Sequence, residues 1–166
     1  NAYVDIEQLY KNKEGLLVLS GGNNSILKYS NGNSITSQSA SFVADFKKEF
    51  IDNFYIEIQR IEGNDYRIDE EVILNLAYDN NIPVVATNDV YFEGPDHFEA
   101  HDALMCIEKK LFVSQKDRKK LSKNHYFKSQ IEMQEVFSDI PEALFNTIEI
   151  AQRCSHRPKI KMPVLP

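Results

Sequence analysis

The stretch VVATNDVYF, residues 84–92, joins a short apolar strand to a run of polar side chains. Residues 84–86 are apolar and predict a short buried strand, and Asn88 and Asp89 lie just beyond it. In parallel α/β proteins ligands sit beyond the carboxyl ends of the strands, so Asp89 is a candidate metal ligand or general base. The alternative is that Asn88 and Asp89 close a turn by accepting hydrogen bonds from their own backbone.

Strand and helix patterns alternate in the chain before this stretch. Strands show apolar and polar residues in alternation, whereas helices show an apolar stripe at intervals of three and four residues. Such alternation, with short connections, predicts a parallel α/β sheet or barrel. The expected elements are a strand at 16–20, a helix at 39–50, a strand at 54–60, a helix at 68–81 and the strand at 84–86.

The last third of the chain has helical patterns without strands. We expect one helix over residues 96–110, and Ser129 and Glu132 have the spacing of a capping box at the start of another. The lysine-rich segment 114–129 reads as a solvated loop. His125 and His156 have polar, lysine-rich neighbours and are expected at the surface.

A final helix is expected near the end of the chain. Pro141 suits its first turn, because a helix leaves its first N–H groups unpaired in any case. Asp139 is the candidate N-terminal cap. Leu144, Ile148 and Ala151 form a stripe that should face a core.

Composition narrows the class of protein. The 166 residues suit one domain. Their net charge of −6 argues against nucleic-acid binding, which needs a basic surface. No apolar run approaches the roughly 20 residues of a membrane-spanning helix. Cys106 and Cys154 lie far apart and outside any CxxC pair, so neither a zinc site nor a disulfide framework is expected, and the reducing cytoplasm is the expected location.

Two further groups of polar residues are candidates for a site. Glu57 and Gln59 share one face of a predicted strand, and they either point into an interior beside Asp89 or form a solvent-facing side. His97 and His101 have the i, i+4 spacing that lets two imidazoles bind one metal. No acid completes an HExxH pattern between them, so capping or local packing is the other interpretation.

Several stretches together resemble one family, in the same order and over nearly the whole chain. They resemble the later part of the PHP (polymerase and histidinol phosphatase) domain of bacterial DNA polymerase III alpha subunits. The stretches are GLLVLSGG (15–22), FYIEIQR (54–60), IPVVATNDVYF (82–92), AHDALMCI (100–107), YFKSQIEM (126–133) and DIPEALFNTIEIAQRC (139–154).

The resemblance implies a fold and a division of the chain. The PHP domain is a distorted (β/α)7, TIM-like barrel of mostly parallel strands, so residues 1–95 would be its second half. Residues 96–166 would be a helical part leading toward the polymerase palm domain, which would follow Pro166. The chain, which starts at Asn1, would then be a segment excised from a longer protein, with an exposed sheet edge that leads to self-association or partial disorder.

The resemblance also identifies a metal site and this chain's departures from it. Some family members bind up to three metal ions at the barrel's carboxyl edge through His, Asp, Glu and sometimes Cys. This chain has Gly22 where active relatives have Cys, Tyr91 where they have His, and Ile61-Glu62-Gly63 in place of a His-Gly pair. Asp89 is retained, and we expect it to be a vestigial metal ligand, because the remaining donors are too few for a trinuclear Zn or Mn centre.

The function implied by the resemblance belongs to a longer chain. That chain would be the replicative DNA polymerase III alpha subunit, a Mg-dependent nucleotidyltransferase that also contacts DNA and the sliding clamp. Within it, this segment would be inactive, with no catalytic or cofactor-binding residue, and would act as scaffold for the other domains and docking surface for the proofreading exonuclease subunit; no membrane partner is expected. The alternative is a metal-dependent phosphoesterase or 3'-5' exonuclease, with Asp89 as ligand and Glu57 in support.

Overall fold

The body of the molecule is a small parallel sheet covered by helices. A computed structural model describes residues 4–22, 27, 36–61 and 70–160. Three strands lie side by side in the order β1 (Val18–Leu19), β2 (Phe54–Gln59) and β3 (Val84–Thr87), and both neighbouring pairs are parallel. The predicted alternation of strand and helix is confirmed, although β1 is shorter than the predicted 16–20.

The helix before β2 forms for the reason that its sequence predicts. α2 (Ser37–Phe50) begins after Thr36, whose hydroxyl accepts a hydrogen bond from the backbone N–H of Ser39 at 3.0 Å. Its apolar residues recur at helical spacing and pack against the sheet. The side chains that it buries are Ser39, Val43, Phe46 and Phe50.

The helix between β2 and β3 packs against β2. α3 (Glu70–Asp79) has two acids in its first turn, where the helix dipole favours negative charge. The predicted inward residues Ile73 and Ala77 are buried, and Leu76 packs partly against the core. The predicted start of this helix at residues 68–69 lies outside the described part of the chain, as do Glu62 and Gly63.

The hydrophobic core lies between these two helices and one face of the sheet. Phe54, Ile56 and Ile58 of β2 alternate onto this face, and Val84 and Ala86 of β3 extend it; each is at most 3% exposed. Burial of a large apolar side chain contributes about 1.5–3 kcal/mol. This face therefore fixes which side of each strand turns inward.

The opposite face of β2 is also covered at its start. Tyr55 is 1% exposed, and its hydroxyl donates to Glu149 at 3.1 Å and accepts from Arg153 at 2.6 Å. Burial is the largest cause that raises the pKa of Tyr55. Both partners come from α6 (Pro141–Arg153), so this helix reaches across to the second face of the sheet.

The start of α6 differs from the sequence prediction in its cap. Pro141 occupies the first turn as predicted, but the residue at the cap position is Ile140, which makes no side-chain capping bond. Asp139 is not the cap, because its carboxylate instead accepts hydrogen bonds from the guanidinium of Arg60 at 2.5 and 2.7 Å.

The inward face of α6 is also different from the predicted stripe. Leu144 packs against the core, whereas Ile148 is 53% exposed and Ala151 is exposed. Ala143 is fully buried, and Asn146 donates to the backbone carbonyl of Val84 in β3 at 2.7 Å. A small residue and a hydrogen-bonding residue thus face the sheet, because the helix lies close to the edge strand.

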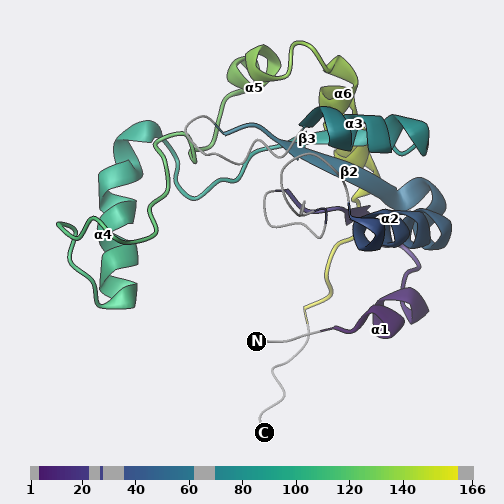
Figure 1. The fold of residues 1–166 in the computed structure, drawn as a ribbon, viewed down its shortest axis with the longest axis horizontal. Helices are drawn as coiled ribbons and strands as arrows, with labels where there is room; N and C mark the ends of the chain where they lie inside the picture. Colours follow the sequence, from purple (N-terminus) through teal and green to yellow (C-terminus); the bar gives the residue numbers. More distant parts are fainter. Residues whose placement is uncertain (1–3, 23–26, 28–35, 62–69, 161–166) are drawn as a thin grey trace, which may run out of the picture.

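The remaining helices follow the body in sequence. Figure 1 shows α4 standing apart from the sheet, with α5 at the end of the segment that returns from it. The predicted capping box of α5 is confirmed: Ser129 and Glu132 exchange side-chain and backbone hydrogen bonds. The helices are α1 (Ile6–Lys11), α4 (Phe98–Lys109) and α5 (Gln130–Val136), with short 3-10 turns at Ile51–Asn53 and Pro95–His97.

The segment that returns from α4 is only partly the solvated loop that its composition predicts. Arg118 and His125 each have side chains that are 2% exposed, so the prediction of a surface position for His125 is wrong. Phe92 and Tyr126 form an isolated parallel bridge that joins the return segment to the chain after β3. Within the described residues, no helix is long and apolar enough to cross a bilayer.

Candidate functional site

The polar side chains at the carboxyl ends of the three strands come together. Ser20 follows β1, and its hydroxyl accepts a hydrogen bond from the backbone N–H of Glu57 in β2 at 3.0 Å. The register places Gln59 of β2 beside Thr87 of β3. Parallel strands end at the same edge, so the sheet itself collects these groups.

Glu57 lies at the centre of this edge and is half-buried. Its Oε1 atom accepts a hydrogen bond from the Thr87 hydroxyl and another from the Gln59 side-chain amide at 3.0 Å. The same amide lies 3.1 Å from the Thr87 hydroxyl oxygen. Glu57 and Gln59 are therefore on the inner side of the edge, where neighbouring side chains pair with one oxygen of the carboxylate.

Gly22 closes the other side of this cluster. A Cβ atom at Gly22 would lie 1.9 Å from Oε1 of Gln59, far inside van der Waals contact. Any side chain at this position would therefore displace the Gln59 amide from Glu57 and Thr87. The present arrangement of the edge therefore requires glycine at position 22, because glycine has no Cβ atom.

Asp89 lies just beyond β3, as the sequence predicts, but its neighbour is a histidine that the sequence places at the surface. The Asp89 carboxylate is 33% exposed, and its Oδ2 atom is 4.0 Å from Nε2 of buried His125. Nδ1 of His125 is 2.9 Å from the hydroxyl of Ser122. Burial is the largest influence on the pKa of His125 and lowers it, although Asp89 acts in the opposite direction.

Aromatic rings fill the space beside Asp89. The Tyr91 ring centroid lies 5.7 Å from that of His101 and 5.8 Å from that of His125, edge-on in both cases. His101 also packs against Phe92 at 5.5 Å. His101 therefore packs locally, which is the alternative interpretation given above for the His97 and His101 pair.

The metal-ligating side chains in the described part of the chain are scattered. Within the described residues, no three His, Cys, Asp or Glu side chains are grouped so that they could hold a metal ion. His97 and His156 are exposed, the latter as predicted. Cys106 is buried and Cys154 is exposed, and both are free thiols.

Arg60, which the sequence does not single out, organises the surroundings of the site. Arg60 follows β2 and donates to the carboxylates of Glu70 and Asp139 and to the backbone carbonyl of Val136. These hydrogen bonds raise the pKa of Arg60 far above its ordinary value. In the sequence, Arg60 is only a charged residue at the end of an apolar strand. That position does not predict its partners, which lie up to 79 residues away in the chain.

The comparisons with known proteins agree on one kind of relative. No family model matches the chain. The chain is 39% identical over 156 residues to the DNA polymerase III subunit alpha of Caulobacter vibrioides, an alignment that covers 94% of this chain and 14% of that protein. The corresponding protein of Rickettsia bellii is 34% identical over 164 residues, with 99% and 14% covered.

A third relative has a similar identity and coverage. The DNA polymerase III subunit alpha of Vibrio cholerae is 37% identical over 157 residues, which are 92% of this chain and 13% of that protein. The chain thus spans about 14% of the length of the relatives that it matches. Over almost all of its residues, the chain is homologous to one segment of the bacterial DNA polymerase III alpha subunit.

Proposed function

We propose that this chain is the later part of the PHP domain of a replicative DNA polymerase alpha subunit and that it acts there as a scaffold. The relatives are alpha subunits, and the alignments cover 92–99% of the chain. In this proposal the three parallel strands are an arc of a (β/α)7 barrel. Residues 1–95 supply that arc, and residues 96–166 form the helical part toward the palm domain.

The hydrogen bonding of Glu57 is the observation that carries the scaffold role. Its carboxylate is bound by Thr87 and Gln59, and the tight approach of Gln59 to Gly22 leaves the edge closed by the protein's own groups. These bonds to Oε1 connect Glu57 of β2 to Thr87 of β3, so the carboxylate helps to hold the two strands together. Asp89, beside buried His125, is then a remnant of a metal site.

The activity of the longer protein follows from the same proposal. DNA-templated DNA synthesis with Mg²⁺ would take place in the domains beyond this segment, as would the DNA contacts of that reaction and contact with the sliding clamp. The segment itself would hold those domains and bind the proofreading exonuclease subunit. Replication of the chromosome places the whole assembly in the cytoplasm.

A metal-dependent phosphoesterase or 3'-5' exonuclease is the second candidate. It is favoured by the position of Asp89, whose carboxylate is one-third exposed at the carboxyl edge and close to a histidine. The two proposals differ in one measurable property. The exonuclease requires a metal bound through Asp89, whereas the scaffold does not.

Metal titration of the complete alpha subunit that contains this segment distinguishes them. Binding of Mn²⁺ and Zn²⁺ is measured by calorimetry, and removal of 3'-terminal nucleotides is measured on a labelled primer. The proteins are wild type, Asp89→Asn and the control Glu93→Gln, an exposed acid four residues away. We expect the same result from all three; binding or nuclease activity lost only in Asp89→Asn would establish the exonuclease.

Docking of the proofreading subunit is tested separately. The 166-residue chain is immobilised, and the purified exonuclease subunit is titrated over it in biolayer interferometry. Saturable binding that free chain abolishes in competition is the expected result. Binding only to the complete alpha subunit, and not to this chain, would place the docking surface in another domain.

A further inference from the structure

The charge of this chain is concentrated in one segment in a way that its total conceals. Residues 109–128, which we name the basic arm, contain seven lysines and one arginine against a single aspartate, a formal charge of +7. The whole chain has a charge of −6, so the other residues together carry −13. An average over the sequence therefore hides a local surface of the opposite sign.

The basic arm is held in place by its own buried groups. The side chain of Arg118 is 2% exposed and forms a double hydrogen bond with Asp102 of α4 at 2.5 Å for each pair of atoms. At the far end of the arm, the bridge between Phe92 and Tyr126 joins it to the chain after β3. The arm thus lies along α4 as a fixed loop, apart from the sheet (Figure 1).

The other charged groups of the arm are available to a ligand. Lys116, Lys119 and Lys123 are exposed, and Lys120 is 52% exposed beside Asp102. A surface rich in lysine is a poor candidate for the core of a protein interface, where lysine is depleted. Closely spaced lysines are, however, what the phosphate backbone of a nucleic acid attracts.

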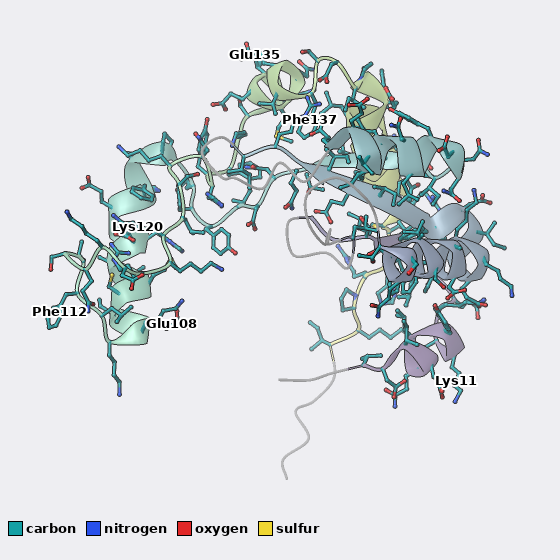
Figure 2. The ribbon with its side chains drawn as sticks, viewed as in Figure 1. Lys11, Glu108, Phe112, Lys120, Glu135 and Phe137 are labelled. Atoms are coloured by element: carbon teal, nitrogen blue, oxygen red, sulfur yellow. The ribbon has the colours of Figure 1, made fainter. Side chains whose placement is uncertain are left out.

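Exposed aromatic rings accompany these lysines. Phe112 is 74% exposed and Phe127 is 71% exposed, near the two ends of the arm. Figure 2 shows Phe112 at the outer tip of the arm and Glu108 on the other side of α4. Bases of a single strand can stack on such rings, whereas the base faces of a duplex are covered by their neighbours.

We propose that the basic arm is a binding surface for single-stranded nucleic acid. Its lysines contact successive phosphates, and Phe112 and Phe127 stack on bases, without sequence preference. The Arg118–Asp102 pair positions the arm and takes no part in binding. This surface is separate from the scaffold role proposed above, because none of its residues belongs to the carboxyl edge of the sheet.

Fluorescence anisotropy with a labelled oligothymidylate of about 20 nucleotides tests the proposal over a series of salt concentrations. The test variant is Lys116→Gln, Lys119→Gln and Lys123→Gln combined. We expect an affinity loss of about ten-fold or more at low salt. The slope of log K against log salt should fall by about 2, because each phosphate contact on a single strand contributes roughly 0.7.

The matched control combines Lys11→Gln, Lys48→Gln and Lys159→Gln, which removes the same charge from exposed positions elsewhere. It should bind the oligonucleotide within about two-fold of wild type, since salt-screened charges act mainly at close range. Equal losses in both triple variants, or no binding by wild type, would overturn the proposal. Circular dichroism confirms that each variant is folded.

A second set of measurements separates single strands from other polyanions. The double variant Phe112→Ala, Phe127→Ala should weaken oligothymidylate binding several-fold and leave the salt slope unchanged, because stacking releases no counterions. A DNA duplex and poly-glutamate of matched charge serve as competitors and should compete poorly. Preference for the duplex would contradict stacking, and preference for poly-glutamate would identify an acidic protein as the partner.

Discussion

The guanidinium of Arg118 forms a bidentate pair with the carboxylate of Asp102, with Nη1–Oδ1 and Nη2–Oδ2 distances of 2.5 Å. The two side chains are 2% and 7% exposed, so the pair is shielded from solvent. Arg118 also donates to the backbone carbonyls of Gln115 and Val113. One side chain thereby fixes the path of the loop that follows α4.

Asp102→Asn should release this loop. The substitution leaves Arg118 in a shielded position without its counter-charge, which is more costly than removing both members of a buried pair. Local opening should then expose the peptide bonds after Lys116 and Lys119 to trypsin, with cleavage at least about ten-fold faster than in wild type. Mass spectrometry of a limited digest identifies the sites.

Asp117→Asn is the control for this loop, because Asp117 is an exposed acid on the same segment. Its digest should match that of wild type. The pH dependence supplies a second check: the pKa of Asp102 is lowered below its ordinary 3.8, chiefly by the hydrogen bonds from Arg118. Because this pKa is lowered, ionised Asp102 stabilises the folded loop fully above pH 3.8, and the stabilisation is lost only at lower pH. Loop protection that already disappears near pH 6 would contradict this pairing.

Tyr126→Phe should raise the pKa of Glu132. The Glu132 carboxylate accepts from the hydroxyl of Tyr126 and from the side chain and backbone N–H of Ser129, and these bonds lower its pKa to about 2 from 4.5. Without the phenol, the NMR titration midpoint of the carboxyl carbon should move upward toward 4.5. Capping by Glu132 is full above 4.5 and is lost as the pH falls to about 2.

Tyr91→Phe is the comparison for this titration, because the Tyr91 ring packs against histidines and lies outside the capping box. Its effect on the Glu132 midpoint should be negligible. An unchanged midpoint in Tyr126→Phe would mean that Ser129 alone lowers the pKa.

Gly22→Ala should couple energetically to Gln59. The new Cβ would overlap the Gln59 amide, which must leave Glu57 and Thr87. We expect destabilisation in the wild-type background and none when Gln59 is already Ala, with a coupling energy of about 1 kcal/mol. Urea denaturation of the four proteins of the cycle measures it.

Gly21→Ala is the neighbouring control, and its cost has another origin. Gly21 has a φ of +81°, a conformation that glycine adopts without strain and alanine does not. Its substitution should cost about 1 kcal/mol whether or not Gln59 is present. A Gly22 effect that is equally independent of Gln59 would contradict the close packing described above.

Asn146→Ala should destabilise the sheet through its edge strand. The Asn146 amide donates to the backbone carbonyl of Val84, and this carbonyl points away from β2. Val84 itself is 1% exposed. A buried carbonyl left unpaired costs about 1–3 kcal/mol. Asn75→Ala, at an exposed position of α3, should instead be neutral or slightly stabilising, because alanine favours helix; equal effects of both substitutions in denaturation experiments would refute the edge contact.

Local patterns were enough to predict much of the body. The stripe of α2 and the alternation of β2 depend on spacings of two to four residues, which the sequence displays directly. The capping box of Ser129 and Glu132 is equally local, since its atoms are three residues apart. The position of Asp89 beyond a strand followed from the order of the elements.

The partners of polar groups could not be predicted in the same way. Asp139 stands where the sequence predicts a helix cap, but it pairs with Arg60. His125 has lysine-rich neighbours in the sequence, but it is buried beside Asp89. Each such pair joins residues that are tens of positions apart. Many charged residues along the chain are equally suitable partners, so only the path of the backbone selects among them.

The sequence by itself determined the order of strands and helices, the parallel sheet and the place of its polar edge, because periodicity and capping act within a few residues. Only the tertiary structure decided that Glu57 is satisfied by Thr87 and Gln59, and that Arg118 holds the basic arm against α4. Hydrogen bonds between distant side chains depend on distances of a few ångströms, which are set when the helices pack on the sheet.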